Sequence, residues 1–593
     1  MRKLNFAAAV FGILAMSGCS LNKMIQLSKE QQLTVNPSPL ELHGDSVSYE
    51  MSANLPVKML QKGKVYSIKN SYKYGSSEME TGQIEFAADE FPNSGTQQPR
   101  ISKEFSFAYD PAMKQGDLMI QGEASDPRNG KSMSTEQLKV AEGVITTSQL
   151  VKDVYYAAYA DHGYNNQEEL IPTKVEFFFE QGRSVLRTSE KRSDRGKYFS
   201  AFVAEKNVTR TVTITGTHSP EGPERINSKL AVDRAAAIEK YYRQQMKRYD
   251  YMGMSDTIKF VLKDVVENWT EFKQMLSKYD GISDDQKSEI TNIVNGSGTF
   301  EDKEDQLQKL SSYKTIFKDI YPDLRTAKTT ILTVKVKKPD AEIAVLAKQV
   351  GEGTVSADTL SDEELSFGAT LTPALKEKEA IYKAAVKKSD SWAANNNLGA
   401  VYLEMAAQSG DKSGMNKYVE IAVTQLEISQ KKQESAPVLI NLGVAYAMQG
   451  NSRKALGAFS KASDIGPGNH VKGLNSVRGA QQIKVAKYTN AVKSTSAGDD
   501  SSENLFNKGL AQLLNKDYQN ASTSFDQAVE KDANDALAYY GAAVASARLK
   551  NQTGVVDNLK KAVEKDPALK AMAVEDLEFA SYAGNTAFQD AIK

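Results

Sequence analysis

One stretch of the chain combines residues that could bind or transform a ligand. Residues 217–242 read THSPEGPERINSKLAVDRAAAIEKYY and follow TVTITG, a strand-like run at 211–216. A strand, a tight Pro/Gly turn and a helix would present Arg234, whose planar guanidinium can hold a carboxylate through two parallel hydrogen bonds. In the turn His218 adjoins Ser219, a pair of residue types that hydrolases use. The stretch therefore indicates either an anion-binding site or a hydrolytic one.

Hydrolysis is the less favoured of the two. Adjacent side chains rarely orient for proton transfer, and no glycine-flanked nucleophile elbow accompanies Ser219. GSG at 296–298 lacks the strand and the lysine that phosphate binding needs. The histidines are far apart in sequence: His43, His162, His218 and His470. With a single cysteine, zinc clusters, internal disulfides and thiol redox pairs are not expected. We therefore expect a non-enzymatic protein without a cofactor or a metal.

That cysteine, Cys19, ends a secretory signal. Arg2 and Lys3 are followed by an apolar run at 6–16 and by the small residues Ser17-Gly18. The run is too short for a permanent membrane span. The ending Met-Ser-Gly-Cys resembles the lipobox of bacterial lipoproteins, with Met16 where leucine is commoner. The resemblance implies that residues 1–18 are a signal peptide and that Cys19 carries the lipid; the alternative is an ordinary cleaved signal followed by a free thiol.

The remainder of the chain is expected to be soluble and tethered to the outer membrane by this lipid anchor. No other segment is apolar for 18 residues, and the sequence after Cys19 lacks the acidic cluster that often marks surface-exported lipoproteins in Bacteroidota. This predicts a position on the periplasmic side. The formal net charge of −1 gives no overall field that would favour nucleic acid.

At 593 residues the chain is too long for one core, and the N-terminal part has its own pattern. Between about residues 30 and 165, short runs such as VSYEMSA alternate apolar and polar residues. Turn clusters such as FPNSGTQQP and DPRNGKS separate these runs. This pattern is typical of an antiparallel sandwich or small barrel. We assign residues 19–165 to an N-terminal all-β, sandwich-like domain.

Residues 170–340 have a mixed α/β pattern. A strand and turn at 174–187, a helical stretch at 189–204 and the strand at 211–216 precede a helix at 227–245. The next strand candidate is TTILTVKVKK, about 85 residues further on. The intervening sequence, about 246–328, predicts a helical insert whose mixed charges are typical of solvated helix faces.

With these strands placed, the stretch resembles the C-terminal domain of outer-membrane protein A and of peptidoglycan-associated lipoproteins. The pattern is a strand ending in glycine, a short turn, an asparagine and a helix that starts L-x-x-x-R-A. The matching residues are Gly216, Gly222, Asn227, Leu230, Arg234 and Ala235. The SPEG turn, ENW and YPDLR resemble a Bacteroidota branch of this family. The resemblance implies an OmpA-like domain that grips the diaminopimelate carboxylate of peptidoglycan, with Ser219, Asn227 and Arg234 as candidate binding residues.

The match departs from the family at one position of the implied site. The family uses an aspartate in the turn together with the helix arginine, and Ser219 stands in the aspartate's place. A serine supplies no charge for an ammonium, and losing a charge-assisted bond costs about 1.5–3 kcal/mol. Glu221 could substitute if the turn folds it inward. Alternatively, Arg234 pairs with Asp233 or Glu221 and only fixes the turn.

The C-terminal part is helical and repetitive. Residues 436–467, APVLINLGVAYAMQGNSRKALGAFSKASDIGP, match the tetratricopeptide pattern, and the chain contains further copies around 396–406, 477–494, 503–535 and 536–567. Small residues let two antiparallel helices approach, and aromatic residues fill the space between them. We assign 341–380 to a linker and helix, and 381–593 to an all-α tetratricopeptide repeat domain. Asn397 and Asn441, on first helices, are candidate positions in its binding groove.

The sequence thus predicts a multidomain protein with two open functions. In the first, it anchors the outer membrane to peptidoglycan while the repeats recruit other envelope proteins. In the second, it is a scaffold subunit of an outer-membrane protein assembly or secretion machine, and its OmpA-like domain no longer binds peptidoglycan. The missing aspartate favours the second function, and the retained Asn227 and Arg234 favour the first.

Overall fold

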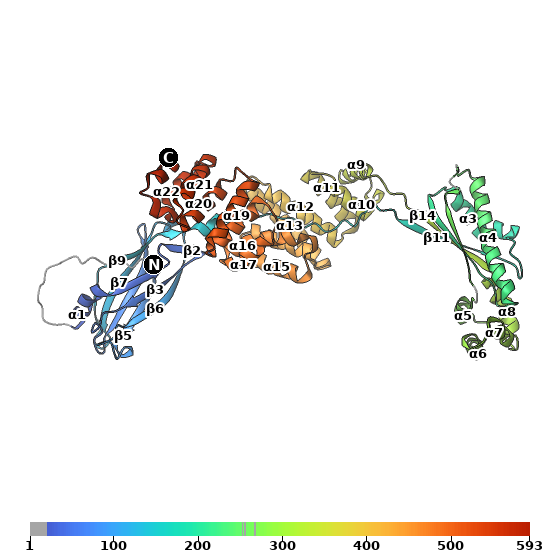
Figure 1. The fold of residues 1–593 in the computed structure, drawn as a ribbon, viewed down its shortest axis with the longest axis horizontal. Helices are drawn as coiled ribbons and strands as arrows, with labels where there is room; N and C mark the ends of the chain where they lie inside the picture. Colours follow the sequence, from blue (N-terminus) through green and yellow to red (C-terminus); the bar gives the residue numbers. More distant parts are fainter. Residues whose placement is uncertain (1–19, 252, 254–255, 266–267) are drawn as a thin grey trace. The chain divides into compact units, whose positions relative to one another are not determined.

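The computed structural model describes residues 20–251, 253, 256–265 and 268–593, so the predicted signal peptide and Cys19 lie outside the described residues. The chain forms two compact units, one made of the residues up to Tyr164 together with Asp340–Lys593, the other of Asn165–Pro339 (Figure 1). The predicted multidomain organisation, with a β-rich N-terminal part and an all-helical C-terminal part, is confirmed.

The N-terminal part of the first unit consists of two sheets. One has the order β1 (Gln32–Asn36), β3 (Ser46–Asn54), β2 (Leu40–His43) and β10 (Val144–Ile145), with β6 (Arg100–Ala108) also paired to β3. The other has the order β5 (Ser77–Ala87), β4 (Val65–Tyr74), β7 (Asp117–Asp126) and β8 (Lys131–Ser134), with β9 (Leu138–Glu142) paired to β7. Every second residue of β7 is buried, as the alternating sequence requires. Both sheets contribute to one core, in which the rings of Tyr72 and Phe107 lie 5.2 Å apart.

This β-rich part ends earlier than the sequence predicted. Its last strand, β10, finishes at Ile145, whereas the predicted boundary was residue 165. Residues 151–164 form no helix or strand. Their contacts, described below, are with the helices of the same unit, and we call this segment the strap.

The second unit, Asn165–Pro339, contains a sheet with the order β11 (Leu170–Phe178), β14 (Thr326–Val334), β12 (Thr209–Gly216) and β13 (Lys259–Asp264). Helices α3 (Asp194–Ala204) and α4 (Glu224–Arg248) pack against it (Figure 1). Phe177, Phe199 and Tyr242 fill the space between sheet and helices. Strand β13 lies inside the segment predicted to be a wholly helical insert. Most of its residues are partly or fully exposed, so it lacks the apolar alternation that identifies a strand.

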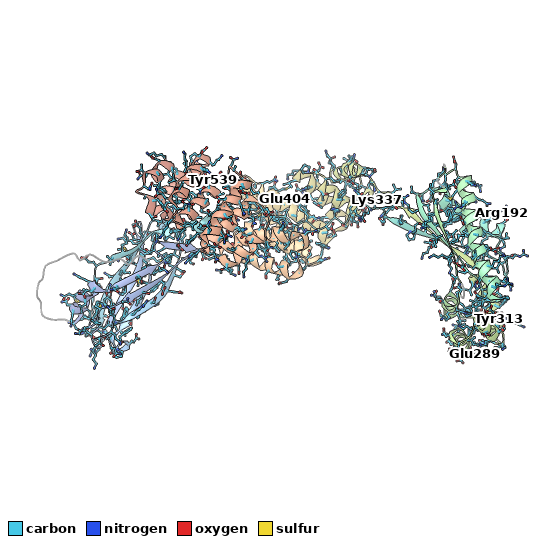
Figure 2. All side chains as sticks on the ribbon, in the orientation of Figure 1. Arg192, Glu289, Tyr313, Lys337, Glu404 and Tyr539 are labelled. Carbon is cyan, nitrogen blue, oxygen red and sulfur yellow. The ribbon has the colours of Figure 1, made fainter. Side chains whose placement is uncertain are left out.

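The rest of that segment is helical and has its own core. It contains α5 (Trp269–Lys278), α6 (Asp284–Asn295), α7 (Phe300–Leu307) and α8 (Tyr313–Asp319). Ser283 and Thr299 form capping boxes that begin α6 and α7. Trp269, Phe272 and Tyr321 are among the buried residues that hold these helices together. Figure 2 labels Tyr313, the first residue of α8, among these helices.

The helical part of the first unit is built from antiparallel pairs. The pairs are α12 (Trp392–Ala407) with α13 (Lys412–Lys432), α14 (Ala436–Met448) with α15 (Ser452–Ile465), α16 (Val471–Lys484) with α17 (Tyr488–Ser496), α18 (Ser502–Leu514) with α19 (Tyr518–Lys531), and α20 (Ala536–Arg548) with α21 (Gln552–Lys565). Before them come α9 (Asp340–Gly351), α10 (Asp362–Thr370) and α11 (Leu375–Ser389), and after them α22 (Leu569–Glu575) and α23 (Thr586–Ala591).

The close approach within a pair explains the glycines of the repeat pattern. A Cβ at Gly443 would lie 2.3 Å from the ring of Phe459, and one at Gly509 would lie 2.9 Å from the ring of Phe525. Real Cβ atoms do not come that close, so α14 and α18 need glycine where the aromatic ring of the second helix of the pair packs. Among the described residues, no helix is long and apolar enough to cross a membrane.

Candidate functional site

The turn between β12 and α4 holds the residues that the sequence singled out in the second unit. It leaves the sheet at Gly216, where a Cβ would lie 1.9 Å from the carbonyl oxygen of Ala231, so α4 packs directly against the end of the strand. At Gly222 the chain takes a φ of +94°, a conformation that favours glycine. Gly216 and Gly222 thus permit the tight path from strand to helix.

Arg234 lies beneath this turn with only 1% of its surface exposed. Its Nη1 donates to the carbonyl oxygen of Thr217 at 2.7 Å, its Nε to that of Arg183 at 3.0 Å and its Nη2 to that of Glu180 at 3.2 Å. Burial lowers the pKa of Arg234 to about 10, the nearby charge of Arg325 adds to this, and Glu221 opposes it. The guanidinium therefore joins the turn, the end of β12 and the loop after β11 through main-chain oxygens.

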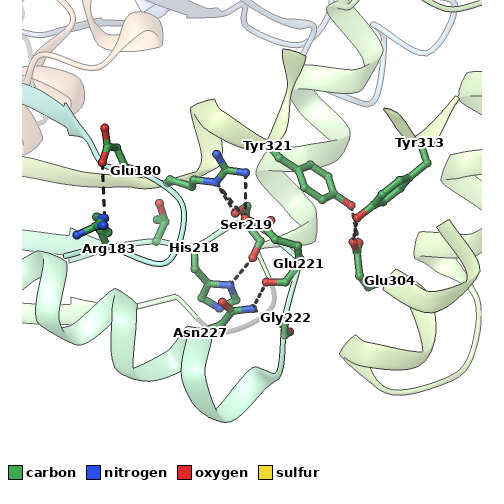
Figure 3. A network of polar contacts seen from close by, with 12 residues as sticks. Glu180, Arg183, His218, Ser219, Glu221, Gly222, Asn227, Glu304, Tyr313 and Tyr321 are labelled. Atoms are coloured by element: carbon green, nitrogen blue, oxygen red, sulfur yellow. Dashed lines mark hydrogen bonds and ion pairs between the residues drawn. The ribbon is translucent and has the colours of Figure 1, made fainter. Parts of the chain in front are cut away.

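Ser219, at the position where the resemblance to OmpA-like domains implies an aspartate, is 3% exposed and is bonded to a second arginine. Arg325 donates from Nε to Ser219 Oγ at 3.0 Å and to Glu221 Oε1 at 3.1 Å, and its Nη2 lies 3.0 Å from the same carboxylate oxygen (Figure 3). Both side chains of this ion pair are largely buried, with exposed fractions of 9% and 13%. Glu221 therefore folds inward, and its partner is Arg325.

This pairing differs from the alternative drawn from the sequence, in which Arg234 pairs with Asp233 or Glu221. Within the described part of the chain, no ion pair joins Arg234 to either carboxylate. Arg325 was missed because the sequence showed it only as the last letter of the YPDLR motif, 106 residues from Ser219. A charged residue directly before a buried strand was the available signal.

Asn227 and His218 complete the turn. Asn227 is 5% exposed and donates from Nδ2 to the carbonyl oxygens of Glu221 and Gly222, both at 3.1 Å, so its amide fixes the main chain of the turn. His218 is 1% exposed, its Nδ1 lies 3.0 Å from the carbonyl oxygen of Ser219, and its ring packs edge-on against Phe300. Its Nε2 has no hydrogen-bond partner among the described residues. The structure thus brings Ser219, Asn227 and Arg234 together, each bonded to the protein itself.

Helix α7 of the insert adds a buried carboxyl group beside this cluster. Glu304 accepts hydrogen bonds of 2.5 Å from the hydroxyls of Tyr313 and Tyr321 (Figure 3). Burial raises the pKa of Glu304, and the two tyrosine hydroxyls offset part of this effect. The cluster is therefore rich in buried charge and is closed by groups from the turn, the insert and the start of β14.

The second candidate region is the face of the solenoid to which Asn397 and Asn441 contribute. Each asparagine side chain forms a matched pair of hydrogen bonds with one residue of the strap. Asn441 accepts from the amide of Ala158 at 2.8 Å and donates to its carbonyl oxygen at 2.8 Å. Asn397 does the same with Ala160, at 2.7 and 3.3 Å. The sequence placed these asparagines correctly on first helices, and their ligand is the chain's own strap.

A third asparagine, not identified from the sequence, extends this ladder along the solenoid. Asn507 on α18 accepts from the amide of Lys152 at 2.9 Å and donates to its carbonyl oxygen at 2.8 Å. Lys152, Ala158 and Ala160 are separated by even numbers of residues, as expected of an extended chain whose alternate residues face one surface. We call the three asparagines the amide ladder.

Strap side chains fill the remaining space. Ala158 is fully buried in the solenoid core. The hydroxyl of Tyr156 lies 2.7 Å from His470 Nδ1, and the ring of Tyr156 occupies the space that a Cβ at Gly473 would need. Lys152 forms an ion pair with Asp535. The solenoid can therefore bind an extended peptide main chain through neutral amides, and this face is already occupied.

Comparison with solved structures finds similarity to tetratricopeptide repeat proteins. No family model matches the chain, and no curated protein matches it. MamA residues 41 to the end from Desulfovibrio magneticus RS-1 is 17% identical, with a TM-score of 0.24, and covers 27% of this chain and 97% of its own. YrrB, a TPR protein with an unusual peptide-binding site, is 20% identical, with a TM-score of 0.26, and covers 32% of this chain and 97% of its own.

The C-terminal part of a TPR repeat-containing protein from Cytophaga hutchinsonii is 16% identical, with a TM-score of 0.28, and covers 43% of this chain and 92% of its own. These likenesses agree with the paired helices described above, and at these scores they carry no argument about function. The functional argument therefore rests on the two sites of this chain.

Proposed function

We propose that this protein is a non-enzymatic scaffold of the bacterial cell envelope, with helical repeats that contact other envelope proteins and an OmpA-like unit that no longer grips peptidoglycan. One observation carries the second half of the proposal. The only arginine that the family pattern offers to a carboxylate ligand, Arg234, has three of its N–H groups bonded to main-chain oxygens of Thr217, Arg183 and Glu180.

The position that should complete the ligand grip supports the same conclusion. Ser219 and Glu221 are bonded to Arg325, so an internal guanidinium and carboxylate form an ion pair where the family binds a zwitterionic ligand. Binding diaminopimelate there would require Arg325 or Arg234 to give up bonds within the protein. Leaving a buried charged group without its partner costs about 3–5 kcal/mol, which is comparable to the binding energy available from one small ligand.

The scaffold assignment rests on the architecture of the first unit. Stacked helix pairs offer extended surfaces that contact other proteins, and they bring no catalytic group of their own. Among the described residues no cluster of His, Cys, Asp and Glu could hold a metal ion. The lipobox-like Met-Ser-Gly-Cys supports tethering through Cys19 to the outer membrane, on its periplasmic side.

Anchoring to peptidoglycan is the second candidate, and one observation favours it. Asn227 and Arg234 keep the family's order and lie together under the turn. In this case Arg234 would hold the turn in the binding conformation, and the ligand would enter by displacing the bonds of Arg325 to Ser219 and Glu221.

Sedimentation with purified sacculi separates the two candidates. We expect the full chain to stay in the supernatant, while a peptidoglycan-associated lipoprotein sediments under the same conditions. Sedimentation of the wild type, lost in Arg234→Ala and retained in the exposed control Arg225→Ala, would establish the anchor and overturn the proposal.

Cross-linking in intact cells tests the scaffold. We expect envelope proteins to cross-link to lysines of the helical repeats, and we expect Cys19→Ser to move the chain out of the membrane fraction. Absence of any cross-linked protein at the repeats would contradict the scaffold.

A further inference from the structure

A large cleft lies at one edge of the solenoid, next to the turn between β2 and β3. Its volume is about 1160 Å³. The turn contributes His43, Gly44 and Asp45 to one wall, and the junctions α14–α15 and α16–α17 form the others. The turn touches the solenoid directly, because a Cβ at Gly44 would lie 3.5 Å from the carbonyl oxygen of Lys484. The strap occupies a different face, so this cleft is a separate surface of the same unit.

Positive charge dominates the lining. Arg453, Arg478 and Lys487 face it without an ion-pair partner among the described residues, and Asp45 is the carboxylate opposite them. Lys484 also lines the cleft, but Asp153 of the strap pairs with it at 2.5 Å. Among the described residues, three cations without ion-pair partners against one carboxylate make the cleft a site of positive potential.

Arg478 is the most informative of these cations because it is half-buried. Its Nη1 donates to Ser463 Oγ at 2.8 Å and its Nη2 donates to Asn475. Its buried Nε and the nearby Oε1 of Gln482 have no hydrogen-bond partner among the described residues. Burial lowers the pKa of Arg478, and no carboxylate opposes this effect. A half-buried guanidinium without a carboxylate partner adds to the positive potential of the cleft.

Two helices also begin at this cleft. Asn451 and Ser452 at the start of α15, and Lys487 and Asn490 at the start of α17, are lining residues. The side chain of Asn451 caps α15, whereas the N-cap residue of α17, Lys487, provides no side-chain cap for the first amide groups of that helix. Helix N-termini carry partial positive charge and bind anions through these amides.

We propose that this cleft binds an acidic segment, rich in Asp and Glu, of a partner protein. The proposal rests on the scaffold function above and identifies the surface that the partner uses. The cleft exceeds the range of about 300–1,000 Å³ that is usual for small ligands, and its cations come from separate helices. An extended acidic peptide can contact cations on separate helices at the same time, whereas a single phosphate cannot. The strap already fills the other peptide-binding face.

Binding of a short labelled peptide of alternating glutamate and glycine to the purified full chain tests this proposal. Fluorescence anisotropy at physiological salt should detect binding that weakens about tenfold in the double variant Arg453→Glu/Lys487→Glu. Both residues are exposed, so the fold should tolerate the change. The double variant Lys531→Glu/Lys560→Glu changes the net charge equally, on exposed positions of α19 and α21 that do not line the cleft, and should bind like the wild type.

Three results would overturn the proposal. These are no binding by the wild type, equal weakening in both double variants, or binding of inorganic phosphate alone at concentrations that exclude the peptide. The last result would identify a small-anion site. The cross-linking test of the scaffold is independent of the peptide, so a scaffold that recruits proteins through another surface would still yield cross-links while the peptide fails to bind.

Discussion

The turn around Arg234 and the solenoid face around Asn441 are both places where the sequence predicts a ligand, and both are filled by the protein itself. They differ in the groups that fill them. At the turn, charged side chains are bonded to nearby main chain and to each other. On the solenoid, neutral amides hold the main chain of the strap, 283 residues away from Asn441 in sequence.

This difference decides how each region responds to change. Buried charges are costly to remove individually, because each leaves a charged or polar group without its partner, and they respond to pH. Neutral amide pairs respond to neither pH nor salt, and they lose stability only when a hydrogen-bonding group is deleted. The turn should therefore be sensitive to both mutation and pH, and the amide ladder to mutation alone.

The largest expected effect is at Arg234. Replacing it with alanine removes donors from three carbonyl oxygens and leaves a large void, so Arg234→Ala should lower the unfolding free energy of the second unit by about 4 kcal/mol. The chain has two tryptophans, and in a Trp392→Phe background the fluorescence of Trp269 reports on this unit alone. Denaturant titrations measure the change.

The exposed Arg225 lies on the same helix, so Arg225→Ala is the matched control and should change the midpoint little. If the two alanine variants unfolded at the same denaturant concentration, the bonds of Arg234 would not stabilise the turn.

The next effect is at the amide ladder. Asn441→Ala leaves the amide of Ala158 and Oδ1 of Asn396 buried without these partners, while the carbonyl of Ala158 still accepts from Asn396 at 2.9 Å, and this should cost about 3 kcal/mol. Local opening of the strap would become about a hundredfold more frequent. Hydrogen exchange at the Ala158 amide measures this directly. Asn490→Ala, at an exposed position of α17, is the control; equal exchange in the two variants would show that the ladder does not hold the strap.

The sequence predicted two of the three ladder positions because the repeat pattern fixes which residues of a first helix face the partner. Asn397 and Asn441 follow from that register. The sequence did not predict that the strap occupies this face of the solenoid, because residues 151–164 have no periodic pattern. They are held mainly through their main chain, which leaves no signature in residue types. The small residues Ala158 and Ala160, two positions apart, were the signal available.

For the turn, the sequence predicted the order of elements and the proximity of Ser219, Asn227 and Arg234. It did not predict burial of Arg234 or its bonds to main-chain oxygens, which depend on the loop after β11. The partner of Glu221 was also missed, because Arg325 comes from beyond the insert. Strand β13 was missed for a related reason, since its position beside β12 is set by pairing and its side chains are mostly solvent-facing.

The smallest expected effect is a pH dependence confined to the charged region. Burial raises the pKa of Glu304 above its ordinary value of 4.5, so the folded unit favours the protonated form. The stability that this proton contributes is complete below pH 4.5 and is lost as pH rises through the folded pKa. Glu304→Gln keeps an acceptor for the tyrosine hydroxyls without a charge, so the variant should gain stability relative to the wild type as pH rises towards neutrality.

Midpoints of denaturant unfolding, followed at Trp269 in the Trp392→Phe background over a pH series, measure that difference. Asp305→Asn is the control, because Asp305 is exposed on the same helix as Glu304 and should show the wild-type dependence. Over the same range, exchange at Ala158, corrected for the intrinsic pH dependence of exchange, should be measured in a Tyr156→Phe background, which removes the bond of the strap to His470. The opening free energy should then change less than the stability of the second unit, because the direct partners of Ala158 are neutral amides. Parallel curves for wild type and Glu304→Gln would remove the distinction between the regions, since the buried carboxyl would then behave as a neutral hydrogen-bonding group like those of the ladder.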